Sequence, residues 1–179
     1  MKTLLALARL IDALNDLFAK VAKWAIFAAC LISAGNAVIR YTLDIGSNAF
    51  LEVQWYLFAA CVMLGAAQVL RVNEHVRVDI LYGIYPTRGK VLVDIFGLAF
   101  FLMPMALFTM YSAWPVLHQM FVTNEMSSNA GGLIRWPAML TIPFGMGLLV
   151  LQGLSEIIKR VGWLMHIHDM DTHYERPLQ

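Results

Sequence analysis

The chain has 179 residues, of which 60% are hydrophobic and 14% are charged, and its formal net charge is +1. Its mean hydropathy of +0.66 lies outside the usual range of water-soluble proteins, and its length leaves room for one membrane domain and little else. It contains no basic stripe with interleaved aromatic side chains, which argues against a nucleic-acid partner.

The first 23 residues predict an amphipathic helix. Apolar side chains recur there at alternating steps of three and four residues, at Leu4, Leu7, Ile11, Leu14, Phe18 and Val21. The other face carries the polar residues Lys2, Arg9, Asp12, Asn15, Asp16 and Lys20. We expect a cytoplasmic helix whose apolar stripe lies on the membrane surface or against a partner helix.

Four uncharged runs follow, at residues 24–39, 53–70, 95–117 and 136–155. They hold about 16, 18, 23 and 20 residues, and a helix needs roughly 20 apolar residues to cross the hydrocarbon core. The first run is short, but the flanking Lys23 and Arg40 can lengthen it by snorkelling. We therefore predict an all-α integral membrane protein with four transmembrane helices.

The positive charges predict the orientation of these helices. Of the thirteen Lys and Arg residues, all but Arg40 and Arg135 precede the first run, lie between the second and third, or follow the fourth. By the positive-inside rule, both termini lie in the cytoplasm. The expected segments are residues 1–23, a four-helix membrane domain at 24–160, and a polar cytoplasmic tail at 161–179.

The first span carries a row of small residues spaced four apart, at Ala25, Ala29, Ser33 and Ala37. Such a row lets another helix approach closely, and the sequence leaves open whether that helix belongs to this chain or to another. At the predicted outer end, Arg40 and Asp44 are spaced to pair at the interface.

The second span begins beside Glu52 and Trp55, a carboxylate at a helix N-terminus and an aromatic residue of the interfacial belt. After this span come Arg71, His75, Arg77 and Asp79. If the helix continues, Arg71, His75 and Asp79 form one polar row; if the segment is extended, His75, Arg77 and Asp79 share one face.

The last two spans contain prolines and glycines. Pro104 predicts a kink in the third span, and Pro143, Gly145, Gly147 and Gly153 predict that the fourth is the most irregular. Two i, i+4 pairs near the helix ends, Lys90 with Asp94 and Glu156 with Arg160, suit surface positions.

No Asp, Glu, Lys, Arg or His falls in the central part of any span, where transport or catalysis within a membrane normally needs polar groups. We expect neither an enzyme nor a cofactor or metal site. The alternative is a membrane redox protein that uses Cys30 and Cys61, both near the middle of predicted spans, or histidine ligands, although all five histidines lie outside the spans.

Several motifs together resemble the small membrane subunit of tripartite ATP-independent periplasmic (TRAP) transporters. They extend over roughly residues 20–160, and the most specific is the run from His75 to Asp79. The motifs are Asn36-Ala-Val-Ile-Arg40-Tyr41, Glu52-Val-Gln-Trp55-Tyr-Leu-Phe, Leu64-Gly-Ala-Ala67, Leu70-Arg71, His75-Val-Arg77-Val-Asp79, Gly131-Gly132-Leu133 and Arg135-Trp136-Pro137.

This resemblance implies a function. In that family a periplasmic binding protein delivers an organic anion, often a carboxylate, to a large membrane subunit that holds the sodium and substrate sites and moves as an elevator. The small subunit is a non-catalytic scaffold of the inner membrane. The small-residue row would then contact the partner, Glu52 the large subunit or the binding protein, and Arg71, His75, Arg77 and Asp79 lipid headgroups or the large subunit.

Overall fold

The structure, a computed structural model, describes residues 2–73 and 82–169, and all of its regular structure there is helical. The long helices are α1 (Lys2–Leu43), α2 (Asn48–Val72), α4 (Met103–Thr123) and α5 (Trp136–Leu164). A 3-10 turn (Tyr82–Ile84), α3 (Thr87–Gly97) and a π-helical turn (Leu98–Leu102) precede α4. Four stretches are long and apolar enough to cross a membrane: α1, α2, residues 87–123 and α5. This confirms the predicted all-α membrane fold.

Helix α1 is longer than the sequence suggests. Residues 2–23 are helical, as expected, but they continue into the first span without a break at residue 23. At about 1.5 Å per residue, the 42 residues of α1 extend over roughly 63 Å, about twice the thickness of the hydrocarbon core. The N-terminal segment is therefore an extension of a membrane helix and not a separate helix.

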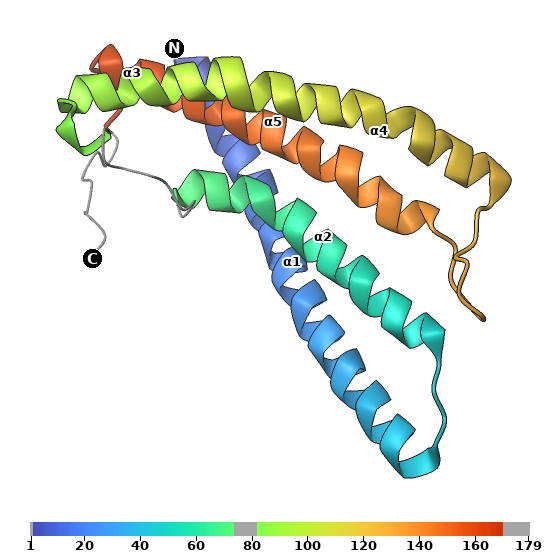
Figure 1. Cartoon of the computed structure of the whole chain (residues 1–179). Helices are drawn as coiled ribbons and strands as arrows, with labels where there is room; N and C mark the ends of the chain where they lie inside the picture. The colour runs from blue at the N-terminus through green and yellow to red at the C-terminus, as the bar shows by residue number, and fades with distance from the viewer. Residues whose placement is uncertain (1, 74–81, 170–179) are drawn as a thin grey trace.

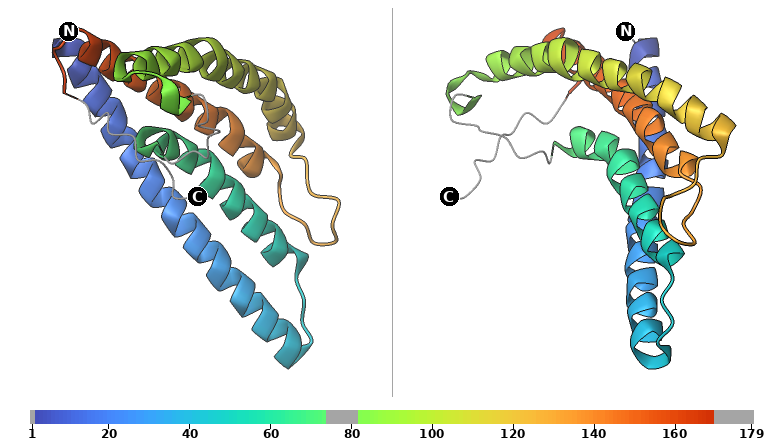
Figure 2. Two further views of the ribbon diagram at one scale, coloured as in Figure 1. Left: turned by 60° about the vertical axis from the view of Figure 1, so that its left-hand side comes forward. Right: turned by 45° about the vertical axis from the view of Figure 1, so that its right-hand side comes forward.

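The helices form two hairpins that diverge (Figures 1 and 2). Helices α1 and α2 make one hairpin, and α4 and α5 make the other. Helix α5 is central, because it packs against α1, α2, α3 and α4. Two asparagines, Asn73 and Asn124, end α2 and α4 in the left-handed conformation, which asparagine adopts readily.

Pro104 does perturb its helix. The π-helical turn ends directly before Met103, and Pro104 follows it at the start of α4, where proline has no N–H to donate to a helical hydrogen bond. Residues 87–123 consequently form one curved rod in Figure 1.

The fourth span is one uninterrupted helix, and its glycines serve close packing. A Cβ added at Gly145 would lie 2.5 Å from the Met63 carbonyl oxygen, so the backbones of α5 and α2 touch there. Gly153 faces the side chains of Leu102 and Met103. A small apolar core forms beside the Met63–Gly145 contact, from Ala22, Leu64, Ala67 and Leu148.

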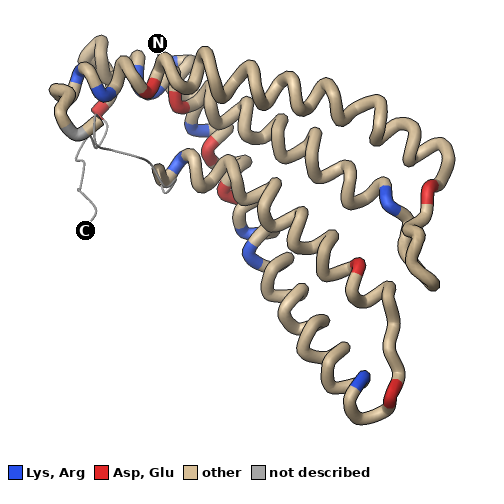
Figure 3. Tube along the Cα trace, in the orientation of Figure 1, with Lys and Arg blue, Asp and Glu red and all other residues tan. Residues whose placement is uncertain are grey.

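Figure 3 places the charged residues in two regions: the N-terminal half of α1 with α3 and the adjoining ends of α2 and α5, and the opposite end of the bundle. We call the end with Arg71, Lys159 and Arg160 the basic end. The opposite end, with residues 44–47 and 124–135, is the loop end.

Candidate functional site

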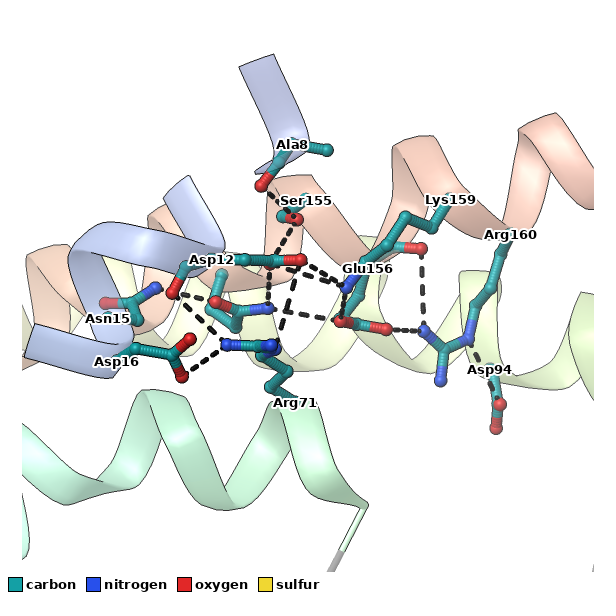
Figure 4. Close-up of polar contacts among 11 residues, drawn as sticks. Ala8, Asp12, Asn15, Asp16, Arg71, Asp94, Ser155, Glu156, Lys159 and Arg160 are labelled. Atoms are coloured by element: carbon teal, nitrogen blue, oxygen red, sulfur yellow. Dashed lines mark hydrogen bonds and ion pairs between the residues drawn. The ribbon is translucent and has the colours of Figure 1, made fainter. Parts of the chain in front are cut away.

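The basic end contains a buried polar cluster, shown in Figure 4, that we call the polar junction. It joins α1, α2, α3 and α5 through side chains that are far apart in the sequence. Its members are Asp12, Asn15, Asp16, Arg71, Asp94, Gln152, Ser155, Glu156, Lys159 and Arg160.

Asp12 of α1 is the central acceptor of the polar junction. Its Oδ1 accepts hydrogen bonds from Gln152 Nε2 at 2.9 Å and Ser155 Oγ at 2.8 Å. Its Oδ2 lies 3.2 Å from Lys159 Nζ. Burial of a carboxylate is tolerated only with such partners, because an uncompensated charge loses its hydration. Asp12 therefore fixes α1 against α5.

The second acidic group, Glu156, is also buried. Only 4% of Glu156 and 7% of Arg160 is exposed, and the two side chains form an ion pair. Lys159 also pairs with Glu156, and Arg160 Nε lies 3.2 Å from Asp94 Oδ2 of α3. The i, i+4 pairing of Glu156 with Arg160 is confirmed, but its expected surface position is wrong, because α1 and α3 cover this part of α5.

Arg71 connects α2 to the same cluster. Its guanidinium pairs with Asp16, donates to the Asp12 carbonyl oxygen at 3.3 Å, and lies 3.9 Å from Asp12 Oδ2. The expected contact of Arg71 with lipid headgroups or the large subunit stays a prediction. Within the chain, Arg71 holds the end of α2 against α1.

The polar residues Asp12, Asn15 and Asp16 of the N-terminal segment thus turn inward, whereas Lys2, Arg9 and Lys20 of the same face are exposed. Asn15 is fully buried and donates from Nδ2 to Gln152 Oε1 at 2.6 Å, while Leu4, Leu7 and Leu14 of the apolar stripe are exposed. In a membrane protein this arrangement is physically reasonable, since most of the buried polar groups bond to one another, although Asn15 Oδ1 has no hydrogen-bond partner among the described residues, and the leucines can meet lipid or a partner.

A second cluster, at the loop end, holds the segment between α4 and α5. Glu52, 2% exposed, accepts hydrogen bonds from Asn129 Nδ2 at 2.7 Å and from the Leu133 amide at 2.6 Å. Asn48 Nδ2 and the Tyr56 hydroxyl donate to carbonyl oxygens of the same loop. We call residues 124–135 the clamped loop.

The clamped loop has a hairpin-like form. Met126 and Ile134 form an antiparallel bridge, and Arg135 pairs with Glu125. A Cβ at Gly132 would lie 2.6 Å from Ser127 Cβ and 3.1 Å from Glu52 Oε1, so only glycine fits beside Glu52. The loop is consequently held in one position over the N-terminus of α2.

The small-residue row of α1 divides into two parts. Ala25 and Ala29 are buried within the chain, whereas Ser33 and Ala37 are exposed, as are Arg40 and Trp55. Partner or lipid contacts of these residues stay predictions. The predicted site residues His75, Arg77 and Asp79 lie outside the described residues, so the choice between a helical and an extended segment stays open.

Of the ten members of the polar junction, the sequence predicted only Arg71 as a site residue, and it gave no role to Gln152 or Ser155. A signal was present. On α5 the polar residues at 152, 155, 156 and 159 share one face at helical spacing, as do those at 12, 15 and 16 on α1. Two polar stripes, one on the predicted N-terminal helix and one at the end of the fourth span, suggest that they face each other.

The two cysteines of the redox alternative form no disulfide bond. Cys30 is exposed on α1 and Cys61 is half-buried on α2, both as free thiols. Within residues 2–73 and 82–169, no group of three or more His, Cys, Asp or Glu side chains is placed to hold a metal ion.

Comparison with protein-family models decides the family. Residues 29–162 match the model described as "Tripartite ATP-independent periplasmic transporters, DctQ component". The chain belongs to the DctQ family. Searches of curated proteins and of solved structures found no match. The DctQ match covers most of the chain, including α2, α4 and the polar face of α5.

Membership establishes the general role. A DctQ protein is the small component of a TRAP transporter, and with four apolar helices this chain is a multi-pass membrane protein. The family is one of transporter components and is generally non-enzymatic. Membership also implies association with a large membrane subunit and a binding protein.

Proposed function

We propose that this DctQ chain is the non-catalytic scaffold of a sodium-coupled, binding-protein-dependent importer of organic anions such as carboxylates. It lies in the bacterial inner membrane with both termini in the cytoplasm, and it packs against the large elevator subunit. The large subunit holds the sodium and substrate sites. This chain needs no cofactor of its own for that role.

The observation that carries the proposal is the distribution of charge. The described acidic and basic residues lie in the N-terminal half of α1, in α3 and near the ends of α1, α2, α4 and α5, and those of the polar junction are paired with one another (Figures 3 and 4). Buried pairs of this kind hold helices in register, whereas an ion or substrate path needs polar groups that can exchange partners along the membrane. A chain with this charge distribution supports a neighbouring subunit that carries the ion and substrate path.

The exposed part of the small-residue row offers a place for that neighbour. Ser33 and Ala37 lie beyond the part of α1 that the chain itself buries. Small residues at this spacing allow close backbone approach, which drives helix association in lipid. We therefore assign this part of α1 to contact with the large subunit.

Co-purification tests both points. The tagged chain, extracted from its native membrane in mild detergent, should bring along the large subunit, identified by mass spectrometry. Ala37→Trp should lower the recovered large subunit without changing the thermal stability of the isolated chain. Val38→Trp is the matched control, since Val38 is exposed on the neighbouring face and should leave recovery unchanged.

The opposite results separate the alternatives. Recovery of the chain alone with a bound chromophore would support the redox alternative instead. Equal recovery for Ala37→Trp and the unaltered chain would remove the assigned contact. Uptake by proteoliposomes that contain this chain alone would contradict the scaffold role.

A further inference from the structure

A cavity lies between α2 and α5 at the loop end, and residues of the chain line it at both of its ends. Its volume is about 560 Å³, within the usual range of ligand sites, roughly 300–1,000 Å³. Met63, which touches Gly145, closes it toward the helix middle. Residues 127–129 of the clamped loop close it at the other end. The hydrogen bonds that Glu52 accepts from the clamped loop therefore shape the cavity.

The walls of the cavity change from polar to apolar along both helices. On α2 the lining begins with Glu52 and Tyr56 and continues to Ala59 and Met63. Met63 lies about 16 Å from Glu52 along the helix axis, at 1.5 Å per residue. On the other wall it runs from Arg135 to the apolar Ile142. A ligand that satisfies these walls has a polar head at the loop end and an apolar tail.

The cavity lies at the level in the membrane that one phospholipid molecule occupies. Glu52 directly precedes the uncharged run that begins at Val53, so the polar mouth lies at the level of the headgroups and the apolar floor lies in the hydrocarbon. A free anion such as phosphate would use the mouth alone and leave the apolar walls unfilled. An acyl chain fills them and removes apolar surface from water.

The charges at the mouth select the headgroup. Arg135 is the one Lys or Arg among the described residues that line the cavity, and its planar guanidinium can bind two phosphate oxygens. Its partner Glu125 is partly exposed, and such a surface ion pair is weak enough to rearrange. Glu52 adds a carboxylate at the same mouth, which attracts an ammonium group and repels extra negative charge.

We propose that this cavity binds one zwitterionic glycerophospholipid, of the phosphatidylethanolamine type. Its phosphate lies on Arg135, its ammonium group lies toward Glu52, and one acyl chain passes Ala59 toward Met63. The bound lipid fills the space that the two diverging hairpins leave at the loop end. The inference goes beyond the transporter assignment and requires only that the chain lies in a membrane.

The test uses the full chain, purified alone in mild detergent and supplied with phosphatidylethanolamine or phosphatidylglycerol, with bound lipid counted by native mass spectrometry. We expect one retained phosphatidylethanolamine and a clear preference for it over phosphatidylglycerol. Arg135→Gln should weaken its retention about tenfold, the effect of losing one charge-assisted hydrogen bond. Ala59→Phe should abolish retention by blocking the path of the acyl chain past residue 59.

Two control variants show whether the effect is local. Arg40→Gln removes a cation at the loop end that does not line the cavity, and Val62→Phe enlarges an exposed residue of α2. Both should retain the lipid. Unchanged thermal unfolding of Ala59→Phe, with normal recovery of the large subunit, would show that loss of lipid is not loss of fold or of assembly.

Four results would overturn the proposal. One is undiminished retention by both Arg135→Gln and Ala59→Phe, which would place the lipid elsewhere. Others are a preference for phosphatidylglycerol, and displacement of the lipid by millimolar inorganic phosphate alone. The last is a crosslink from Ala59→Cys to the large subunit in the intact complex, which would show that a protein segment fills the cavity.

Discussion

Replacement of Gly145 by alanine tests the contact that sets the distance between α5 and α2. The added Cβ would lie 2.5 Å from the Met63 carbonyl oxygen and 2.7 Å from Met63 Cβ. Ordinary contacts of this kind are about 3.5 Å, so the helices must separate by roughly 1 Å. Because the nearest atom is backbone, no rotamer change removes the clash.

The expected cost follows from overpacking. Forcing extra volume into a packed interface costs about 1–3 kcal/mol, while alanine in place of glycine favours a helix by about 1 kcal/mol. Gly147→Ala has the same helix benefit, but its Cβ would meet only Met110 Sδ at 3.8 Å. The difference between the two variants therefore isolates the clash.

The assay is the free energy of unfolding of each variant in mixed detergent micelles. Gly145→Ala should be less stable than Gly147→Ala by about 1–3 kcal/mol. Trimming the neighbour in a Met63→Ala, Gly145→Ala double variant should not restore stability, because the carbonyl oxygen remains. Equal stability of the two single variants would refute the close approach of α2 and α5.

Three further changes test the two clusters. Lys159→Met should destabilise the chain by about 1.5–3 kcal/mol in the same assay, since Asp12 and Glu156 lose their shared cation, whereas the exposed Lys20→Met should have little effect. Equal values would mean that the polar junction adds no stability. Glu52→Gln should speed hydrogen exchange at the Leu133 amide, because a neutral amide oxygen is a weaker acceptor than a carboxylate. Unchanged exchange would show that the hydrogen bond to Glu52 does not hold the loop. Gly132→Ala should expose the loop to protease more than Gly131→Ala does, even though Gly131 has a φ of +70°, because only Gly132 lies against Glu52. The reverse order would show that the backbone conformation at Gly131, and not the contact with Glu52, holds the loop in its position.

The sequence alone determined the four membrane helices and the charge-free middle of each. Hydropathy and charge are properties of a local stretch, and the bilayer acts on each stretch separately. The family resemblance was also readable from short motifs that contain residues such as Arg40, Glu52 and Arg71, because such motifs are local stretches of sequence. Expectations for His75, Arg77 and Asp79 stay as the sequence gives them, since they lie outside the described residues.

The tertiary structure decided which polar side chains meet. Asp12 and Lys159 are 147 positions apart, and Glu52 and Leu133 are 81 apart, so no local pattern connects them. Helical periodicity shows that residues share a face, but a polar face has the same spacing whether it meets water or a second polar face. That is why Asn15 and Glu156, expected at a surface, are buried where α1 and α3 cross α5.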